Sequence, residues 1–101
     1  MDAEIQFMVK SDNPPKVELT DAGLYVRFQT GVAVARTVIQ NEWPHIAVDL
    51  DAKEEVIGIE VVPVPPAFSI NSIANIAAKA RVGGLPSYKA GDVLIENLCA
   101  A

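Results

Sequence analysis

Apolar and polar side chains alternate along much of residues 1–62, which is the pattern of half-buried β-strands. The alternation is clearest at 4–10, 24–30 and 56–62, and a shorter example lies at 46–50. Residues 32–40, VAVARTVIQ, are rich in β-branched side chains, which pack well on a pleated surface. We therefore expect four or five strands in this part of the chain.

Turn-forming residues between these segments predict which strands are neighbours. Asp21-Ala22-Gly23 is typical of a turn or bulge, in which Gly23 can tolerate a positive φ. Gly31 is expected to fold residues 24–40 into one hairpin, and the polar turn DAKEE to fold 46–62 into a second. Residues 41–45, which contain Pro44, are interpreted as the connection between the hairpins. Such short connections favour an antiparallel meander over β-α-β units.

After the proline-rich segment 63–66 the apolar period changes from two to three or four, which predicts a helix. Ser69 is a suitable N-cap, and Gly83 or Gly84 can supply a left-handed C-terminal cap, so we expect the helix over 70–82. Its apolar stripe consists of Ile70, Ile73, Ile76, Ala77 and Ala80. The expected fold class is α+β: an antiparallel β-meander of four to five strands with one α-helix, about 70–82, packed on one face. The later segment DVLIENL is too short to decide between strand and helix.

The size and charge of the chain narrow the classes of function. Its 101 residues suit a single domain, 1–101, with one core. The net charge of −5 argues against binding nucleic acid or an anionic membrane surface, since both repel an acidic protein. Cys99 is the only cysteine, so no disulfide can form within the chain. Because there is neither a basic, apolar leader nor an apolar stretch of about 20 residues, we expect a cytoplasmic location.

Three motifs follow one another between residues 22 and 62. They are Gly23-Leu24-Tyr25-Val26, Val34-Ala35-Arg36-Thr37-Val38, and a hairpin from Val48-Asp49-Leu50-Asp51 to Val56-Ile57-Gly58-Ile59-Glu60. In order and spacing they resemble the Domain of Unknown Function 2283 family of small bacterial proteins. Lys53-Glu54-Glu55 stands where that family usually has a glycine, and residues 67–101 extend past the family's common part as a helix and C-terminal extension. The resemblance implies a compact antiparallel sheet with limited helix and no established activity, and some members resemble small proteins encoded beside toxin-like neighbours.

Carboxylates are densest in the second predicted hairpin, but their pattern argues against a metal site. Asp49, Asp51 and Glu60 fall at the first, third and twelfth positions of an EF-hand loop. Lys53, however, takes the fifth position, a ligand position, and Glu54 takes the sixth, where that loop needs glycine. We therefore expect a solvated turn in which Asp49 and Asp51 accept hydrogen bonds, with no metal and no cofactor.

Four side chains are candidates for an interaction surface: Trp43, His45, Tyr25 and Arg27. His45 is the only histidine, so it cannot form a multi-histidine metal site, and no motif supplies a nucleophile for it to activate. Trp43 is either a cap buried over the sheet, the interpretation we favour, or an exposed anchor for a partner. We assign no catalytic residue, and the sequence favours a non-catalytic role over an enzyme.

Apolar residues of 32–40 and 56–62 occupy both faces of their strands, which is more than one short helix can cover. We therefore expect a homo-oligomer, in the simplest case a dimer. Three functions remain open: a non-catalytic interaction module that self-associates, an antitoxin-like partner of a small basic toxin, and a small-ligand-binding protein or enzyme. The third requires a pocket that gathers His45, Tyr25, Arg27 and acidic hairpin residues. The first is favoured because it needs no residue that the chain lacks.

Overall fold

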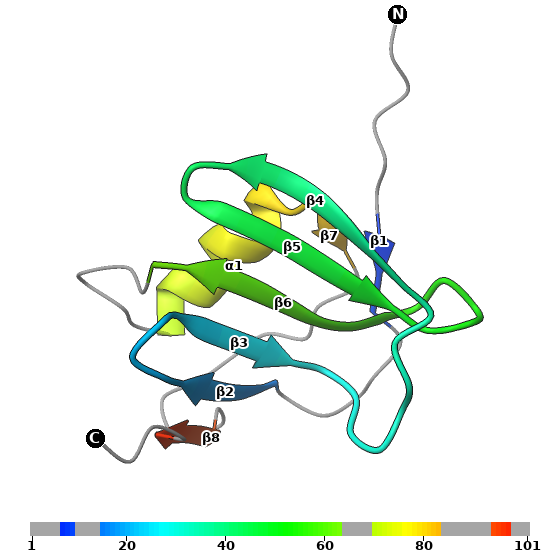
Figure 1. Ribbon diagram of the computed structural model, residues 1–101, viewed down its shortest axis with the longest axis horizontal. Helices are drawn as coiled ribbons and strands as arrows, with labels where there is room; N and C mark the ends of the chain where they lie inside the picture. Colours follow the sequence, from blue (N-terminus) through cyan, green and yellow to red (C-terminus); the bar gives the residue numbers. More distant parts are fainter. Residues whose placement is uncertain (1–6, 10–14, 64–69, 84–93, 98–101) are drawn as a thin grey trace, which may run out of the picture.

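A helix and a small second sheet lie on one side of a six-stranded sheet (Figure 1). The computed structural model describes residues 7–9, 15–63, 70–83 and 94–97. The large sheet contains β2 (Lys16–Leu19), β3 (Leu24–Arg27), β4 (Arg36–Glu42), β5 (His45–Leu50), β6 (Val56–Val62) and β8 (Leu94–Asn97). Behind it in Figure 1 lie α1 (Ile70–Lys79) and the pair β1 (Phe7–Met8) and β7 (Val82–Gly83). This architecture, mostly β with one short helix, agrees with the expected α+β class.

The strands of the large sheet run in the order β4-β5-β6-β3-β2-β8. All neighbours are antiparallel except β2 and β8, which are parallel. The predicted hairpin over 46–62 is confirmed as β5–β6. The predicted hairpin over 24–40 is wrong, because β3 pairs with β2 and β6, and two strands separate it from β4. The expected meander is therefore limited to β4, β5 and β6.

Two tight turns explain this pairing. Thr20 to Gly23 closes β2 onto β3, and the backbone N–H of Thr20 donates to the Gly23 carbonyl at 2.9 Å. Trp43 and Pro44 close β4 onto β5. Residues 41–45 are therefore the turn of one hairpin with the adjoining strand ends, and the prediction that they connect two hairpins is wrong. Strands joined by tight turns pair with each other, which leaves residues 28–35, with Gly31 at a φ of 71°, as the connection to the sheet edge.

Gly23 forms the turn predicted for it, but for a different reason. Its φ is not positive. A side chain at Gly23 would instead collide with the carbonyl oxygen of Val61 on β6, so glycine is required there by the close approach of two strands.

The apolar core lies between the large sheet and α1. Val26, Val48 and Ile59 come from three adjacent strands and are completely buried. They belong to one apolar cluster that also contains Ile73 and Ile76 of α1. Removal of these side chains from water is the main force that holds the helix to this face of the sheet.

The helix ends at Lys79, three residues before the predicted end at 82. Arg81, and not a glycine, adopts the left-handed conformation that ends it, with a φ of 59°. Its carbonyl then accepts a hydrogen bond from the N–H of Phe7 at 2.8 Å, and Gly83, one of the predicted caps, pairs with β1 as part of β7.

Some sequence-based expectations concern residues outside those described. They include most of the predicted strand 4–10, residues 64–66, Ser69, Gly84, Cys99 and most of the extension after residue 83. Of the segment left undecided between strand and helix, the described part is the strand β8.

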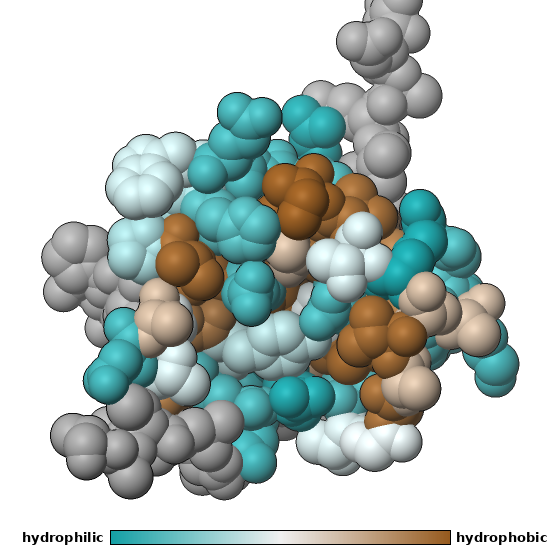
Figure 2. Space-filling model, in the orientation of Figure 1, coloured by the Kyte–Doolittle hydropathy of each residue, from teal (hydrophilic) through white to brown (hydrophobic). Residues whose placement is uncertain are grey.

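The face of the large sheet that points away from α1 is mostly polar, contrary to the expectation of apolar side chains on both faces. In Figure 2, apolar groups on this face are separated by polar ones. A β-bulge in β6, where Ile57 is the extra residue opposite the Asp49–Leu50 step, lets both Val56 and Ile59 reach the core. Strict alternation assigned those two residues to opposite faces, so the bulge reduces the apolar surplus that it predicted for residues 56–62.

Candidate functional site

A chain of side chains, linked by hydrogen bonds and one cation–π contact, crosses the polar face of the sheet from β2 to β4. Arg27 on β3 donates to both carboxylate oxygens of Glu18 on β2, at 2.5 and 3.2 Å. The Arg27 guanidinium also lies 4.8 Å from the centre of the Tyr25 ring, a cation–π distance. The hydroxyl of Tyr25 donates to Asp49 on β5 at 2.7 Å, and that of Thr37 on β4 donates to the same carboxylate at 2.5 Å. We call these five residues the cross-strand network.

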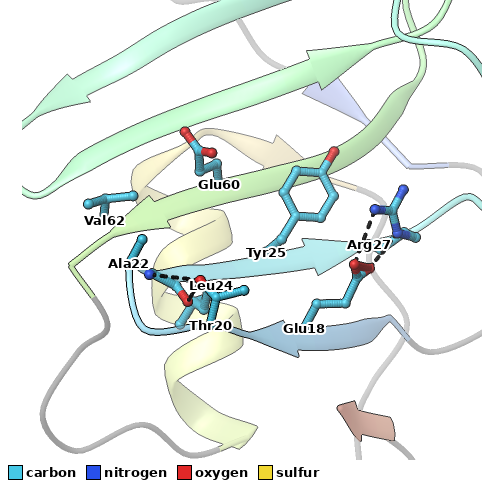
Figure 3. A pocket seen from close by; sticks show the side chains of 9 residues that line it. Glu18, Thr20, Ala22, Leu24, Tyr25, Arg27, Glu60 and Val62 are labelled. Atoms are coloured by element: carbon cyan, nitrogen blue, oxygen red, sulfur yellow. Dashed lines mark hydrogen bonds and ion pairs between the residues drawn. The ribbon is translucent and has the colours of Figure 1, made fainter. Parts of the chain in front are cut away.

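Gly58 on β6 makes the network possible. The Tyr25 ring starts on β3, lies over β6 and points its hydroxyl toward β5 (Figure 3). Gly58 is the β6 residue directly opposite Asp49, and a Cβ atom there would overlap the ring atoms and the hydroxyl of Tyr25. Only glycine lets the ring pass this close to the backbone. The resemblance motif contains this glycine, but the sequence pattern did not indicate that Tyr25 would need it.

Electrostatics in the network favour a neutral tyrosine between charged groups. Burial raises the pKa of Tyr25 above its usual range, and the hydrogen bond and negative charge of Asp49 raise it further. The hydrogen bond to Glu18 raises the pKa of Arg27, which therefore stays charged. Tyr25 consequently keeps its proton at neutral pH and can donate its hydrogen bond to Asp49, so the network links neighbouring strands.

A shallow hollow of about 270 Å³ lies beside Tyr25, between the β2–β3 turn and the end of β6. It is lined by Glu18, Thr20, Ala22, Gly23, Leu24, Tyr25, Arg27, Glu60 and Val62 (Figure 3). Its volume is just below the roughly 300–1,000 Å³ typical of small-molecule sites. Two of its charges already have partners, because Glu18 binds Arg27 and Glu60 lies 3.2 Å from Nε2 of His45. The hollow thus offers a ligand little unpaired charge.

The four residues predicted as one interaction surface are divided between two places. Tyr25 and Arg27 line the hollow, and His45 is linked to it through Glu60. Trp43 lies at the tip of the β4–β5 hairpin with 79% of its surface exposed, so its predicted burial as a cap over the sheet is wrong. Within the described residues, no hydrogen bond or ion pair joins Trp43 to the other three.

The acidic hairpin turn behaves as predicted at one aspartate and differently at the other. Asp51 accepts hydrogen bonds from the backbone N–H groups of Lys53 at 2.8 Å and Glu55 at 3.0 Å. These bonds hold the pKa of Asp51 below its usual range, and the bond from Glu55 has the largest effect. Asp49 takes no part in the turn, because it lies on β5 and serves the cross-strand network. Among the described residues, no group of three His, Cys, Asp or Glu side chains is placed to hold a metal ion.

The outer edge of β4 is a feature that the sequence analysis missed. In the described part of the chain, β4 pairs with β5 on one side and with no strand on the other. All four large apolar side chains that are exposed in this part of the chain lie on β4 or within a few residues of its ends: Val32 at 38%, Val34 at 50%, Ile39 at 54% and Trp43 at 79%. The available signal in the sequence was the apolar run 32–40, followed three residues later by Trp43. The predicted hairpin over 24–40, however, placed that run inside the sheet.

Comparisons with protein-family models, curated proteins and solved structures found no match to this chain. The resemblance of residues 22–62 to the Domain of Unknown Function 2283 family therefore stays a prediction. None of the described helices has the length and apolar character needed to cross a membrane.

Replacement of Gly58 by alanine tests whether Tyr25 needs the bare backbone. Gly58→Ala should lower the free energy of unfolding by about 1–3 kcal/mol, the usual cost of an added group in a packed site. In a Tyr25→Ala background the same change should cost much less, because the ring that it strikes is gone. Urea unfolding of the four proteins measures both effects, and equal costs in the two backgrounds would contradict the proposed contact.

The pKa of Tyr25 gives a second test of the network. An ordinary tyrosine ionises near about pH 10. Folded Tyr25 should keep its proton above that pH, so the stability that it contributes is present below about pH 10 and is lost as the pH rises toward its folded pKa. The ultraviolet absorbance titration curve of the Tyr25→Phe variant is subtracted from that of the wild-type protein, which separates the signal of Tyr25 from that of Tyr88. Asp49→Asn should lower the Tyr25 pKa and leave the part of the shift that burial causes. A wild-type Tyr25 that ionises like a free tyrosine would refute this.

Proposed function

We propose that this protein is a non-catalytic interaction module that self-associates through the outer edge of β4. One observation carries the proposal: three of the four large apolar side chains that are exposed among the described residues, Val34, Ile39 and Trp43, lie on β4 or within two residues of its ends. Scattered single exposures are normal on protein surfaces, whereas apolar residues gathered along one element indicate a contact surface.

The edge has the backbone as well as the side chains for such a contact. β4 is seven residues long, and its outer backbone N–H and C=O groups face no described strand. Its charged residues, Arg36 and Glu42, stand at its two ends, so residues 37–41 between them carry no charge. Proteins commonly protect free edges with lysine, proline or short strand length, and residues 37–41 contain neither lysine nor proline. A partner strand can therefore pair here without burying a charge.

Trp43 is the strongest individual candidate for an anchor. Tryptophan is over-represented among the few residues that dominate binding energy at protein interfaces. Here its indole is held out at a hairpin tip whose shape is fixed in part by Asn41, whose side-chain amide donates to the Pro44 carbonyl at 2.8 Å. A large apolar group presented on a rigid turn loses little conformational entropy when it is buried by a partner.

The other two functions have weaker support. The ligand-binding alternative called for a pocket that gathers His45, Tyr25 and Arg27, and the hollow does bring Tyr25 and Arg27 together. Its charges are paired within the chain, however, and it is small. For the antitoxin-like alternative, the net charge of −5 suits a basic partner, but no described surface feature points to one.

Light scattering and sedimentation over a range of concentrations test the proposal. The wild-type protein should be a dimer at high micromolar concentration. Trp43→Ala should raise the dissociation constant by about 30-fold or more, since loss of an interface anchor costs about 2 kcal/mol. Lys53→Ala, which changes an exposed residue in the β5–β6 turn, is the matched control and should leave the dissociation constant unchanged. A wild-type protein that stays monomeric at high micromolar concentration would refute self-association.

A further inference from the structure

We infer that two copies of the chain pair antiparallel along their β4 edges, with the two-fold axis at Ile39. The inference rests on the proposed function and adds the geometry of the contact. In a two-fold dimer each partner uses the same surface, so the surface must be complementary to itself. The distribution of apolar and charged residues along residues 32–43 meets that requirement.

The apolar side chains are arranged on both sides of a centre. Ile39 is the exposed apolar residue in the middle of β4, Val34 precedes the strand, and Trp43 comes directly after it. A two-fold axis at Ile39 places the two Ile39 side chains against each other. It also brings the residues after β4 in one copy to the residues before β4 in the other. Trp43 of one copy then reaches residues 34–36 of its partner, where Val34 offers an apolar surface.

The charges at the ends of β4 agree with the same arrangement. An antiparallel pairing brings the Arg36 end of one strand to the Glu42 end of the other, whereas a parallel pairing would bring like charges together. Arg36 is already bound by Glu54 of its own chain at 2.6 Å, but both side chains are more than half exposed. An exposed ion pair contributes little, so Arg36 remains available to a second carboxylate.

The bulge in β4 limits how far regular pairing can extend. The register with β5 shifts between Ile39 and Asn41, so Gln40 is an extra residue. Regular pairing therefore holds from the strand start to Ile39, and the register beyond is offset by one residue. An indole reaches diagonal as well as direct cross-strand neighbours, which is why we assign Trp43 to a short segment of the partner and not to one residue.

The exposed aromatic and aliphatic groups of this edge supply part of the area that a stable dimer buries. A buried aromatic side chain removes about 150–250 Å² from water, so the two indoles alone supply about 300–500 Å². That is roughly a quarter of the about 1,200–2,000 Å² that stable protein interfaces bury in total. The two Ile39 side chains, the two Val34 side chains and the paired backbones of two seven-residue strands add to it.

Disulfide trapping of the full chain tests the position of the axis. Cys99, the only native cysteine, is first replaced by serine. In an antiparallel pair, directly opposed Cα atoms lie about 4.5–5.5 Å apart, within the range of about 4.4–6.8 Å that disulfides span. Ile39→Cys should therefore form a crosslinked dimer under mild oxidation. Thr37→Cys is the matched control on the same strand, because its twin would lie about four residues away along the strand, or roughly 13 Å.

The expected result is at least about tenfold more crosslinked dimer for Ile39→Cys than for Thr37→Cys, given the steep distance limit of a disulfide. Circular dichroism of both variants establishes that they fold. If crosslinking requires a mixture of Ile39→Cys with Thr37→Cys, the axis lies at Val38 and the inference is overturned. If light scattering shows a dimer but neither cysteine variant, alone or mixed with the other, forms a crosslink, self-association is supported and the proposed geometry is wrong. If the unmodified protein is a monomer, both proposals fall.

Discussion

The contact between the Tyr25 ring and Gly58 is the constraint on which the rest of the sheet depends. Because Gly58 has no side chain, the ring crosses β6 and reaches Asp49 on β5. Asp49 also holds Thr37 on β4, and on the other side Arg27 covers the ring and holds Glu18 on β2. A face bridged from β2 to β4 by polar side chains cannot also carry an apolar layer. The core must therefore lie on the opposite face, where α1 covers it.

This division explains where exposed apolar surface is left. With one face occupied by the core and the other by the network, three of the four large apolar side chains that remain exposed in the described residues lie on β4 or next to its ends. The sequence pattern indicated self-association because two apolar faces needed cover. The structure weakens that reason, because the bulge in β6 brings Val56 to the core, and it supplies another reason, the open edge of β4. The proposal is unchanged in kind, but its location and geometry are now specific.

Alternation of side chains located the central strands well, since a strand with one face in a core has to repeat every two residues. It also found α1 through the change of period after the prolines. It failed where one residue changes the count: the bulge at Ile57 let Val56 and Ile59 share a face, and no local pattern marks that position. The prediction of strand pairing failed for a related reason. Gly31 and Trp43-Pro44 are both typical of turns, and only tertiary packing decides which of them closes a hairpin. Tyr25 and Arg27 were correctly expected to lie together. The passage of the Tyr25 ring over Gly58 involves three strands, β3, β6 and β5, and spacing along the chain does not reveal it.

Trp43 is the only tryptophan, so tryptophan fluorescence reports on the surroundings of this one side chain. Its indole is 79% exposed in a single copy and would be buried in the dimer. The most direct measurement is the wavelength of maximum emission over a dilution series. Our account predicts blue-shifted emission at high concentration that moves to the red on dilution, in step with the mass from light scattering. Emission typical of a fully solvated indole at every concentration would contradict it.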